Sequence, residues 1–205
     1  MVTILKIVGA GLAGAVGTFL SSKLVEKNGW SLGGLVDDTF NSQIISIFAK
    51  YTDCIMQWPI EKIQILANTY INQIDNVSKQ QREAARIAFV ARTMIAPIIE
   101  EIIYRGPQVV GGVALEQFGI HPVISQSIIG ICTNIMFALA HTASINDISA
   151  RLRCAQFSTP AAKGVVLAVT AGCCEGYSGI VASIIAHVFS NLPAAVKKYK
   201  QELAI

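Results

Sequence analysis

The stretch PIIEEIIYRG, from Pro97 to Gly106, places two adjacent glutamates and an arginine inside a run that is otherwise almost wholly apolar. Charged groups in apolar surroundings are costly unless they are paired or hydrogen-bonded. On a helix, Glu101 and Arg105 are four residues apart and only about 40° apart around the axis, so they can pair. Glu100 points about 100° away from Glu101 and faces something else. Alone, the stretch is also compatible with a surface ion pair on a soluble helix.

The composition favours a membrane protein. Charged residues make up 14% of the 205 residues, whereas a soluble domain usually carries about 25%. Apolar residues make up 53%, and the mean hydropathy is +0.53. The net charge of +3 is small and no Lys/Arg run is interleaved with aromatic residues, so the chain shows no sign of nucleic-acid binding. The length suits one domain or one compact membrane bundle.

The hydrophobic pattern indicates helices almost throughout, so we expect an all-α, polytopic transmembrane helical bundle. Residues 1–81 are expected to form N-terminal membrane or amphipathic helices, residues 82–195 the core, and residues 196–205 a basic C-terminal tail. A polar loop is expected over 142–162. The expected helices are 4–25, 42–57, 59–75, 82–105, 107–119, 122–141, 163–174 and about 180–195.

The N-terminal segment contains Gly9-x-Gly11-x-x-Gly14, which matches the dinucleotide-binding fingerprint. That fingerprint requires a strand before the glycines and further βα units after them. No clear β-branched strand follows Leu24, and the chain downstream has a helical pattern. We therefore expect no nucleotide cofactor and interpret the glycines as small residues that allow close helix packing in lipid.

Two further polar groups lie in the apolar C-terminal half. The stretch FALAH ends the expected helix 122–141 with His141, and Phe137 lies one turn earlier on the same face. In the stretch HVFSN, His187 and Asn191 are four residues apart, on one helix face and about 6 Å apart in rise. By itself, His141 is typical of a solvated helix end, and the second pair is typical of a polar contact between membrane helices.

Taken together, the three groups favour a functional site. Ionisable residues inside a membrane are functional-site candidates by default. A carboxylate and an imidazole can polarise a water molecule, and an imidazole with a carboxamide can donate hydrogen bonds to a developing oxyanion. A peptide hydrolase needs these parts, so we expect an active site among the C-terminal four or five helices.

The stretches EEIIYR, FALAH and HVFSN, in that order, resemble the EExxxR, FxxxH and HxxxN motifs of the CAAX protease and bacteriocin-processing (CPBP) family. These proteins are intramembrane peptidases related to the type II CAAX prenyl proteases. The resemblance covers about residues 82–195, and residues 1–80 show none. The sequence departs from the family at Ser178-Gly179, where threonine-glycine-serine is usual.

The resemblance implies a role for each motif residue. Glu100 and His141 would activate the attacking water. His187 and Asn191 would bind the carbonyl oxygen as it becomes an oxyanion. The remaining motif residues would be supports: Glu101, Arg105, which would hold the glutamate pair in place, and Phe137.

The resemblance leaves the cofactor open, because the family has been described both as glutamate-dependent and as metal-dependent. Glu100, His141 and His187 would also supply three zinc ligands and leave one position open. We favour chemistry without a cofactor, because Asn191 suits an oxyanion donor better than a zinc ligand.

These residues can meet only if the helices run in particular directions. Helix 122–141 ends at His141, and the next two helices cross away and return, which places Asn191 on the side of His141. Glu100, near the end of the expected first core helix, must then lie on that side as well. The segment 107–119 therefore has to carry the chain back across. Because thirteen residues reach only about 20 Å, we expect a tilted or re-entrant helix there.

The distribution of positive charge predicts the orientation, because basic residues gather on the cytoplasmic side of membrane proteins. We therefore expect an integral protein of the cell (inner) membrane with its active site toward the cytoplasm. The basic residues expected on the side of the site are Arg151, Arg153, Lys163, Lys197, Lys198 and Lys200. Three basic residues expected on the opposite side disagree with this orientation: Lys79, Arg82 and Arg86.

The sequence therefore predicts an intramembrane endopeptidase that hydrolyses a peptide bond in a membrane-associated peptide or protein. Its expected partners are membrane lipid and that substrate, and the resemblance implies prenylated CAAX tails as one substrate type. The alternative is a non-enzymatic membrane immunity or scaffold protein on the same fold. We favour the enzyme, because a scaffold has no need of the complete set of Glu100, His141, His187 and Asn191.

Overall fold

The computed structural model describes residues 2–28, 43–142, 155–174 and 176–203. These residues are helical apart from short turns and contain no strand, which confirms the all-α expectation. The elements are α1 (Val2–Asn28), α2 (Gln43–Ile71), α3 (Val77–Val90), a π-helical segment η3 (Ala91–Ile95), α4 (Ala96–Gln117), α5 (Pro122–Ala140), α7 (Ala155–Gly172) and α8 (Tyr177–Leu203).

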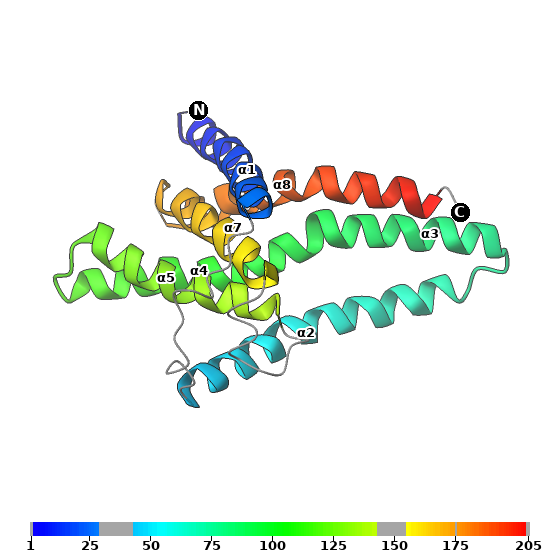
Figure 1. The fold of residues 1–205 in the computed structure, drawn as a ribbon, viewed down its shortest axis with the longest axis horizontal. Helices are drawn as coiled ribbons and strands as arrows, with labels where there is room; N and C mark the ends of the chain where they lie inside the picture. The colour runs from blue at the N-terminus through cyan, green and yellow to red at the C-terminus, as the bar shows by residue number, and fades with distance from the viewer. Residues whose placement is uncertain (1, 29–42, 143–154, 175, 204–205) are drawn as a thin grey trace.

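The helices form a bundle and an arm (Figure 1). The bundle consists of α1, α4, α5, α7 and the N-terminal part of α8, with α1 packed on α7 and α8. The arm consists of α3 and the C-terminal part of α8, which run side by side away from the bundle. Phe89 of α3 lies against Tyr199 of α8, with ring centroids 5.2 Å apart. Arg92 of η3 pairs with Glu202 of α8 at 2.9 Å.

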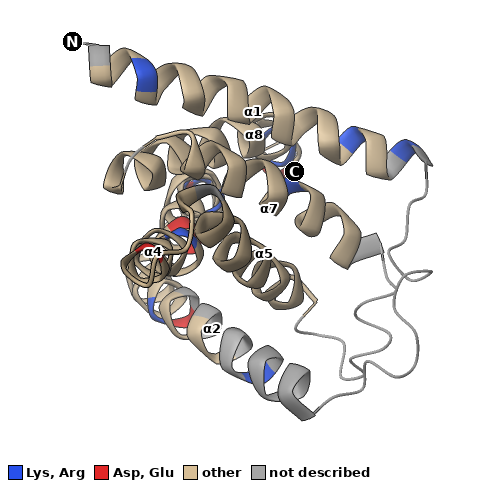
Figure 2. Ribbon diagram, turned by 90° about the vertical axis from the view of Figure 1, so that its left-hand side faces the viewer, with Lys and Arg blue, Asp and Glu red and all other residues tan. Residues whose placement is uncertain are grey.

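The bundle has an apolar outside, the reverse of a soluble protein, and its interior combines an apolar core around Tyr104, Phe137 and Leu167 with buried polar side chains. Helix α5 contains no charged residue and exposes one stripe of isoleucines, namely Ile124, Ile128, Ile131 and Ile135. In Figure 2, α5 is accordingly tan throughout. Fully buried polar and charged side chains include Thr18, Glu101, Arg105, Ser125 and Ser183.

This inversion indicates a surface that faces lipid, where large apolar side chains are stable and charges must be paired inside. Among the described residues, two helical segments are long and apolar enough to cross a membrane, Thr3–Val25 and Tyr177–Leu203.

The glycines of α1 are packing residues. A Cβ on Gly11 would lie 2.6 Å from Ile185 Cγ2, and a Cβ on Gly14 would lie 2.9 Å from Ala186 Cβ. Any larger side chain would therefore push α1 away from α8. Gly9-x-Gly11-x-x-Gly14 lies inside one uninterrupted helix rather than at a strand-to-helix turn, which confirms the packing interpretation.

Two helices are longer than expected from the sequence. Helix α2 runs through Pro59 without a break, so the two expected segments 42–57 and 59–75 are one helix. Helix α8 runs through Pro193 and ends at Leu203, so the expected tail 196–205 is helical to that residue. A proline inside a helix removes one hydrogen bond and can bend the helix, but it ends the helix only when nothing else holds the two halves in line.

The polar loop expected over 142–162 is shorter than predicted. Its last part is helical, because α7 begins at Ala155 and contains Pro160. Residues 143–154 of this loop, including Arg151 and Arg153, lie outside the described residues.

The expected helix end near Arg105 is wrong. Helix α4 continues through Pro107 to Gln117, so 107–119 is not a separate helix. The chain instead turns after α4, where Gly119 adopts a φ of +80°, and α5 returns along α4. This α4–α5 hairpin carries the chain back to the side of Glu100.

The π-helical segment η3 has a local cause. Pro97 has no backbone N–H and therefore cannot donate to the carbonyl of Thr93 four residues earlier. The helix widens at this point, and the N–H of Ala96 bonds to the carbonyl of Ala91, five residues back. Such π segments re-aim the following residues and are frequent at functional sites. Glu100 follows η3 by little more than one turn.

The basic residues of α3 lie at the same end of the molecule as those of α8, which corrects the expectation that they lie on opposite sides. The expectation placed a membrane crossing between Lys79 and Glu100. In the structure α3 belongs to the arm, and the contacts of Phe89 with Tyr199 and of Arg92 with Glu202 fix it beside the C-terminal turns of α8. All three side chains that disagreed with the orientation belong to α3.

Candidate active site

A cavity of about 350 Å³ lies where the bundle meets the arm. The structure brings all four expected catalytic residues to this cavity. Glu100 comes from the second turn of α4, and His141 directly follows α5. His187 and Asn191 lie one turn apart in the middle of α8. The convergence follows from the α4–α5 hairpin and from the contacts that α8 makes with α4.

Glu100 lies in the wall of the cavity with one polar contact. Its side chain is 11% exposed, and Oε2 lies 3.5 Å from His187 Nε2. That distance is too long for a good hydrogen bond. The carboxylate therefore keeps lone pairs that point toward the cavity.

Glu101 is fully buried and has three partners. His187 Nδ1 donates to Glu101 Oε1 at 2.8 Å, and Arg105 Nε donates to Oε2 at 3.2 Å. The hydroxyl of Ser183 also donates to Oε2. The contact with Glu101 orients the His187 ring, so that its Nε2 faces Glu100 and the cavity. The expected pairing of Glu101 with Arg105 is confirmed.

Arg105 ties this network to two other helices. Its guanidinium donates to Gln108 Oε1 at 3.3 Å and to the backbone carbonyl of Gly164 at 3.1 Å. Gln108 in turn donates to the carbonyl of Ala168 at 3.1 Å. The arginine therefore holds Glu101 directly and does not contact Glu100, so the expectation that Arg105 supports the glutamate pair holds for only one of the two glutamates.

The sequence reasoning missed Ser183, Gln108 and Gly164. Ser183 is four residues before His187 and therefore lies on the same helix face, and Gln108 is three residues after Arg105. A search for polar residues one turn from each motif residue would have found both. No sequence signal marks Gly164, which contributes its backbone carbonyl.

His141 is exposed and held in one orientation. Its Nδ1 lies 2.8 Å from the carbonyl oxygen of Phe137, which can only accept, so Nδ1 carries the hydrogen. In the neutral ring Nε2 is then an acceptor. The Phe137 ring packs between the two histidines, with centroid distances of 4.6 Å to His141 and 5.9 Å to His187. Phe137 therefore separates and supports both rings.

Asn191 is partly exposed at the cavity, and its carboxamide makes no hydrogen bond to any described residue. The amide is therefore available to a ligand. Three basic residues also line the cavity, namely Arg92, Lys163 and Lys198.

The three zinc ligands considered from the sequence, Glu100, His141 and His187, all line this cavity. Within the described ranges, no group of three or more His, Cys, Asp or Glu is placed to hold a metal ion. One nitrogen of each histidine is bonded within the protein, Nδ1 of His141 to Phe137 and Nδ1 of His187 to Glu101.

Comparisons with known proteins agree with the three motifs. Residues 82–193, more than half of the chain, match the family described as type II CAAX prenyl endopeptidase Rce1-like. No curated protein and no solved structure matches the chain. The matched region begins in α3 and ends in α8. It contains all residues that line the site cavity except Ala194, Ala195 and Lys198. Together with the apolar surface of the bundle, the match indicates an integral membrane protein. The chain belongs to the type II CAAX prenyl endopeptidase Rce1-like family, a family of CAAX-type intramembrane endopeptidases.

Proposed function

We propose that this protein is an intramembrane endopeptidase that hydrolyses a peptide bond in a membrane-associated peptide or protein of the CAAX type. The observation that carries the proposal is the single cavity lined by Glu100, His141, His187 and Asn191. Family membership supports the reaction class. A non-enzymatic scaffold would not need these four side chains on one cavity.

In the proposed reaction, Glu100 is the general base. Its carboxylate takes a proton from a water molecule in the cavity as the water oxygen attacks the scissile carbonyl carbon. His141 Nε2 accepts the second hydrogen of that water and orients it, since Nδ1 is engaged by Phe137. Protonated Glu100 then gives its proton to the leaving amine, which restores the carboxylate.

The developing oxyanion would be bound by two donors on α8. The Asn191 carboxamide donates one hydrogen bond. The other comes from the Nε2–H of His187 in its doubly protonated form, in which both ring nitrogens donate and Glu101 Oε1 is the partner of Nδ1. Glu101 supports this role by accepting from His187 Nδ1, which fixes the direction of the ring. The one-turn spacing of His187 and Asn191 places both groups on the same side of the cavity.

Zinc is not part of the proposal, because Asn191 lines the cavity one turn from His187 and suits an oxyanion donor better than a zinc ligand. The proposal predicts that prolonged dialysis against a chelator leaves activity intact. Loss of activity on chelation, restored by stoichiometric Zn²⁺, would overturn the proposed chemistry and would make His187 a ligand.

The reaction is tested with purified protein in lipid nanodiscs and a panel of CAAX-type peptides, lipidated and unlipidated. Cleavage is followed by mass spectrometry, which also gives the position of the broken bond. We expect at least one peptide to be cut by the wild-type protein. Binding of peptides without cleavage of any of them would favour the scaffold alternative.

We also propose that the arm and the site cavity face the cytoplasm. The support is the concentration of basic residues at this end, from Lys79, Arg82 and Arg86 in α3 to Lys197, Lys198 and Lys200 in α8. In intact cells, cysteines introduced at Gln80 and Gln201 should resist an impermeant thiol reagent, and one at Phe118 should react. The opposite pattern would reverse the orientation.

A further inference from the structure

Three basic side chains line the site cavity and have no part in the proposed reaction. They are Arg92 of η3, Lys163 of α7 and Lys198 of α8. Each comes from a different element, so the fold brings them together rather than one charged segment of the chain. Lys198 lies beyond residue 193, where the family match ends, so family membership does not account for it.

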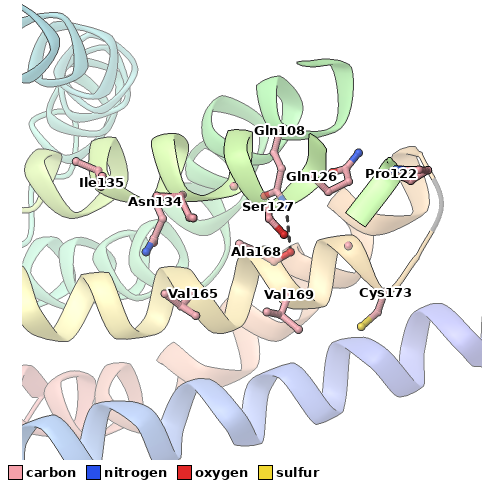
Figure 3. Close-up of a pocket in the computed structure, with 13 residues that line it drawn as sticks. Gln108, Pro122, Gln126, Ser127, Asn134, Ile135, Val165, Ala168, Val169 and Cys173 are labelled. Atoms are coloured by element: carbon pink, nitrogen blue, oxygen red, sulfur yellow. Dashed lines mark hydrogen bonds between the residues drawn. The ribbon is translucent and has the colours of Figure 1, made fainter. Parts of the chain in front are cut away.

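A second hollow shows that such charge is not a general feature of hollows in the bundle. It has a volume of about 580 Å³ and lies between α5 and α7 (Figure 3). The described residues that line it include no Lys, Arg, Asp or Glu. One of them, Gln108, uses its carboxamide within the protein and donates to the carbonyl of Ala168, as the dashed line in Figure 3 shows. The smaller site cavity therefore holds the charged groups of the two hollows.

Basic residues outnumber acidic ones around the site cavity. Among the described residues that line it, Glu100 is the one carboxylate. Outside the lining, Glu202 pairs with Arg92 at 2.9 Å. Two carboxylates thus face three cations, and cations that converge repel one another unless an anion lies among them. The cavity can therefore take a further anionic group.

Two of the three cations keep donors for such a group. Lys198 is exposed and forms no ion pair or hydrogen bond with any residue of the described ranges. Its ammonium group carries three N–H donors. Arg92 uses Nη1 on Glu202, but its side chain is 40% exposed and the guanidinium carries five N–H donors. Both side chains can therefore bind a ligand in the cavity without breaking the ion pair.

These cations lie at a defined distance from the reacting groups. Arg92 is eight residues before Glu100 on the continuous helix formed by η3 and α4, and Lys198 is seven residues after Asn191 on α8. These separations correspond to about 12 Å and about 10 Å along the helices. An extended peptide advances about 3.3 Å per residue. A peptide with its scissile bond at Glu100 therefore reaches the cations within a few residues.

From this arrangement we propose that Arg92, Lys163 and Lys198 form a subsite that binds a carboxylate of the substrate peptide, a few residues from the scissile bond. The assignment rests on the proposed function, since it takes the site cavity as the place of the peptide. An acidic side chain and a free C-terminus supply the same chemistry. Guanidinium and ammonium groups donate charge-assisted hydrogen bonds to a carboxylate, about twice as strong as neutral ones. The subsite selects among substrates and takes no part in bond cleavage.

Peptide binding tests the subsite directly. The experiment uses the full chain with Glu100→Gln, to prevent turnover, in nanodiscs of zwitterionic lipid, and measures Kd by fluorescence anisotropy. The peptides share one uncharged sequence. One is amidated at the C-terminus, one has a free C-terminus, and an amidated series carries a single glutamate at successive positions.

We expect at least one carboxylate peptide to bind about tenfold tighter or more than the uncharged peptide, as a charge-assisted hydrogen bond provides. Tighter binding of the free acid assigns the subsite to the C-terminus, and tighter binding within the glutamate series assigns it to an acidic side chain. Equal Kd values for all the peptides would overturn the proposal.

Two adjacent lysines provide a matched pair of variants. Lys198 lines the cavity, whereas Lys197 is exposed on the same helix and does not line it. Lys198→Gln should lower the preference for the carboxylate peptide over the uncharged one about fivefold or more, and Lys197→Gln should leave that preference as it is. Lys198→Glu should reverse the preference in favour of a peptide with lysine in place of the glutamate. Equal effects of Lys198→Gln and Lys197→Gln would overturn the assignment.

Lipid composition distinguishes a substrate subsite from attraction to lipid headgroups. The same measurements are repeated in nanodiscs that contain phosphatidylglycerol. The preference for the carboxylate peptide and its dependence on Lys198 should be present in both lipids. A dependence on Lys198 that appears only with the anionic lipid would overturn the proposal, because Lys198 would then act through the membrane surface.

A cleavage assay separates this proposal from the proposed function. In the wild-type protein the carboxylate should lower KM with little change in kcat, because its hydrogen bonds form before bond cleavage and persist through it. Cleavage with equal KM for carboxylate and uncharged peptides would refute the subsite and leave the proposed function standing. Binding that depends on the carboxylate and on Lys198, in a protein that cuts no peptide, would leave the subsite standing and refute the proposed function.

Discussion

Two adjacent glutamates belong to different regions of this molecule. Glu101 lies in a closed network, with no exposed surface and with His187, Arg105 and Ser183 as partners. Glu100, the next residue, lies in the wall of the site cavity and makes one long contact with His187. Neighbours on a helix point about 100° apart, so one turn of α4 supplies both an internal support and a group that faces the cavity.

The difference shows how a charged site remains stable inside an apolar bundle. A buried ion pair is favourable only when further hydrogen bonds satisfy both partners, and the Glu101–Arg105 network meets that condition by reaching α7 and α8. The network then holds His187 in place, while Glu100 stays open to a ligand. We call Glu100 and the other cavity residues the open side, and the network of Glu101 the closed side. Substitutions on the open side should lower activity, and substitutions on the closed side should lower stability.

The largest expected effect is on catalysis at the open glutamate. Glu100→Gln should lower turnover by about 10²–10⁴-fold, because the amide cannot accept the proton of water. The melting temperature should change little, since the side chain makes only one long contact. Steady-state cleavage in nanodiscs measures the first quantity and thermal unfolding the second.

Glu116→Gln is the matched control for that change. Glu116 lies on the same helix, near its far end, where it accepts from Ser125 at 3.3 Å. The Glu116→Gln variant should retain normal turnover, because Glu116 does not line the site cavity. Near-normal turnover of Glu100→Gln would refute the proposed mechanism.

The next effect is on stability at the closed network. Arg105→Ala leaves the buried Glu101 carboxylate without its charged partner and should lower the free energy of unfolding by about 3–5 kcal/mol. Chemical unfolding in mild detergent measures it, and activity should fall with the folded fraction. Arg86→Ala removes an exposed partner of Glu83 and Tyr199 and should lower the free energy of unfolding only slightly. An Arg105→Ala protein as stable as Arg86→Ala would show that the network does not stabilise the fold.

The sequence predicted the open side of this boundary better than the closed side. Glu100, His141, His187 and Asn191 belong to motifs whose spacing can be recognised, and all four reach one cavity. The closed side depends on contacts between distant helices, such as Arg105 with the carbonyl of Gly164, for which no local pattern exists.

The fold was predictable as a set of helices, but their ends were not. Helix 122–141 was placed within one residue of α5 because His121-Pro122 and the apolar run define it. Elsewhere the expected helix ends are wrong because they were placed at prolines. Pro59 and Pro107 suggest breaks, but both lie inside continuous helices. Pro107 also explains why the sequence does not predict the arm. A helix break at Pro107 implies that residues 82–119 cross the membrane twice, whereas α3, η3 and α4 run in one direction from the arm into the bundle.

A smaller effect is expected at the oxyanion side of the cavity. Asn191→Ala should lower kcat by about 10²–10³-fold with little change in KM, because the carboxamide acts mainly on charge that develops in the transition state. Stability should not change, since Asn191 bonds to no described residue. A rise in KM at constant kcat would instead show that Asn191 binds the substrate in its ground state.

The smallest expected effect is the loss of stability when the Ser183 hydroxyl is removed from the network of Glu101. Ser183 donates to the buried carboxylate of Glu101, so Ser183→Ala should lower the free energy of unfolding by about 1–3 kcal/mol. Ser190, two turns along the same helix, is also buried but donates to the backbone carbonyl of His187, which keeps its place in the helix. Ser190→Ala should therefore destabilise the protein less than Ser183→Ala. Chemical unfolding of the two variants in the same detergent gives the comparison. If Ser183→Ala lowers the free energy of unfolding no more than Ser190→Ala does, the hydrogen bond from Ser183 does not stabilise Glu101. The stabilising network would then consist of Glu101, His187 and Arg105 alone.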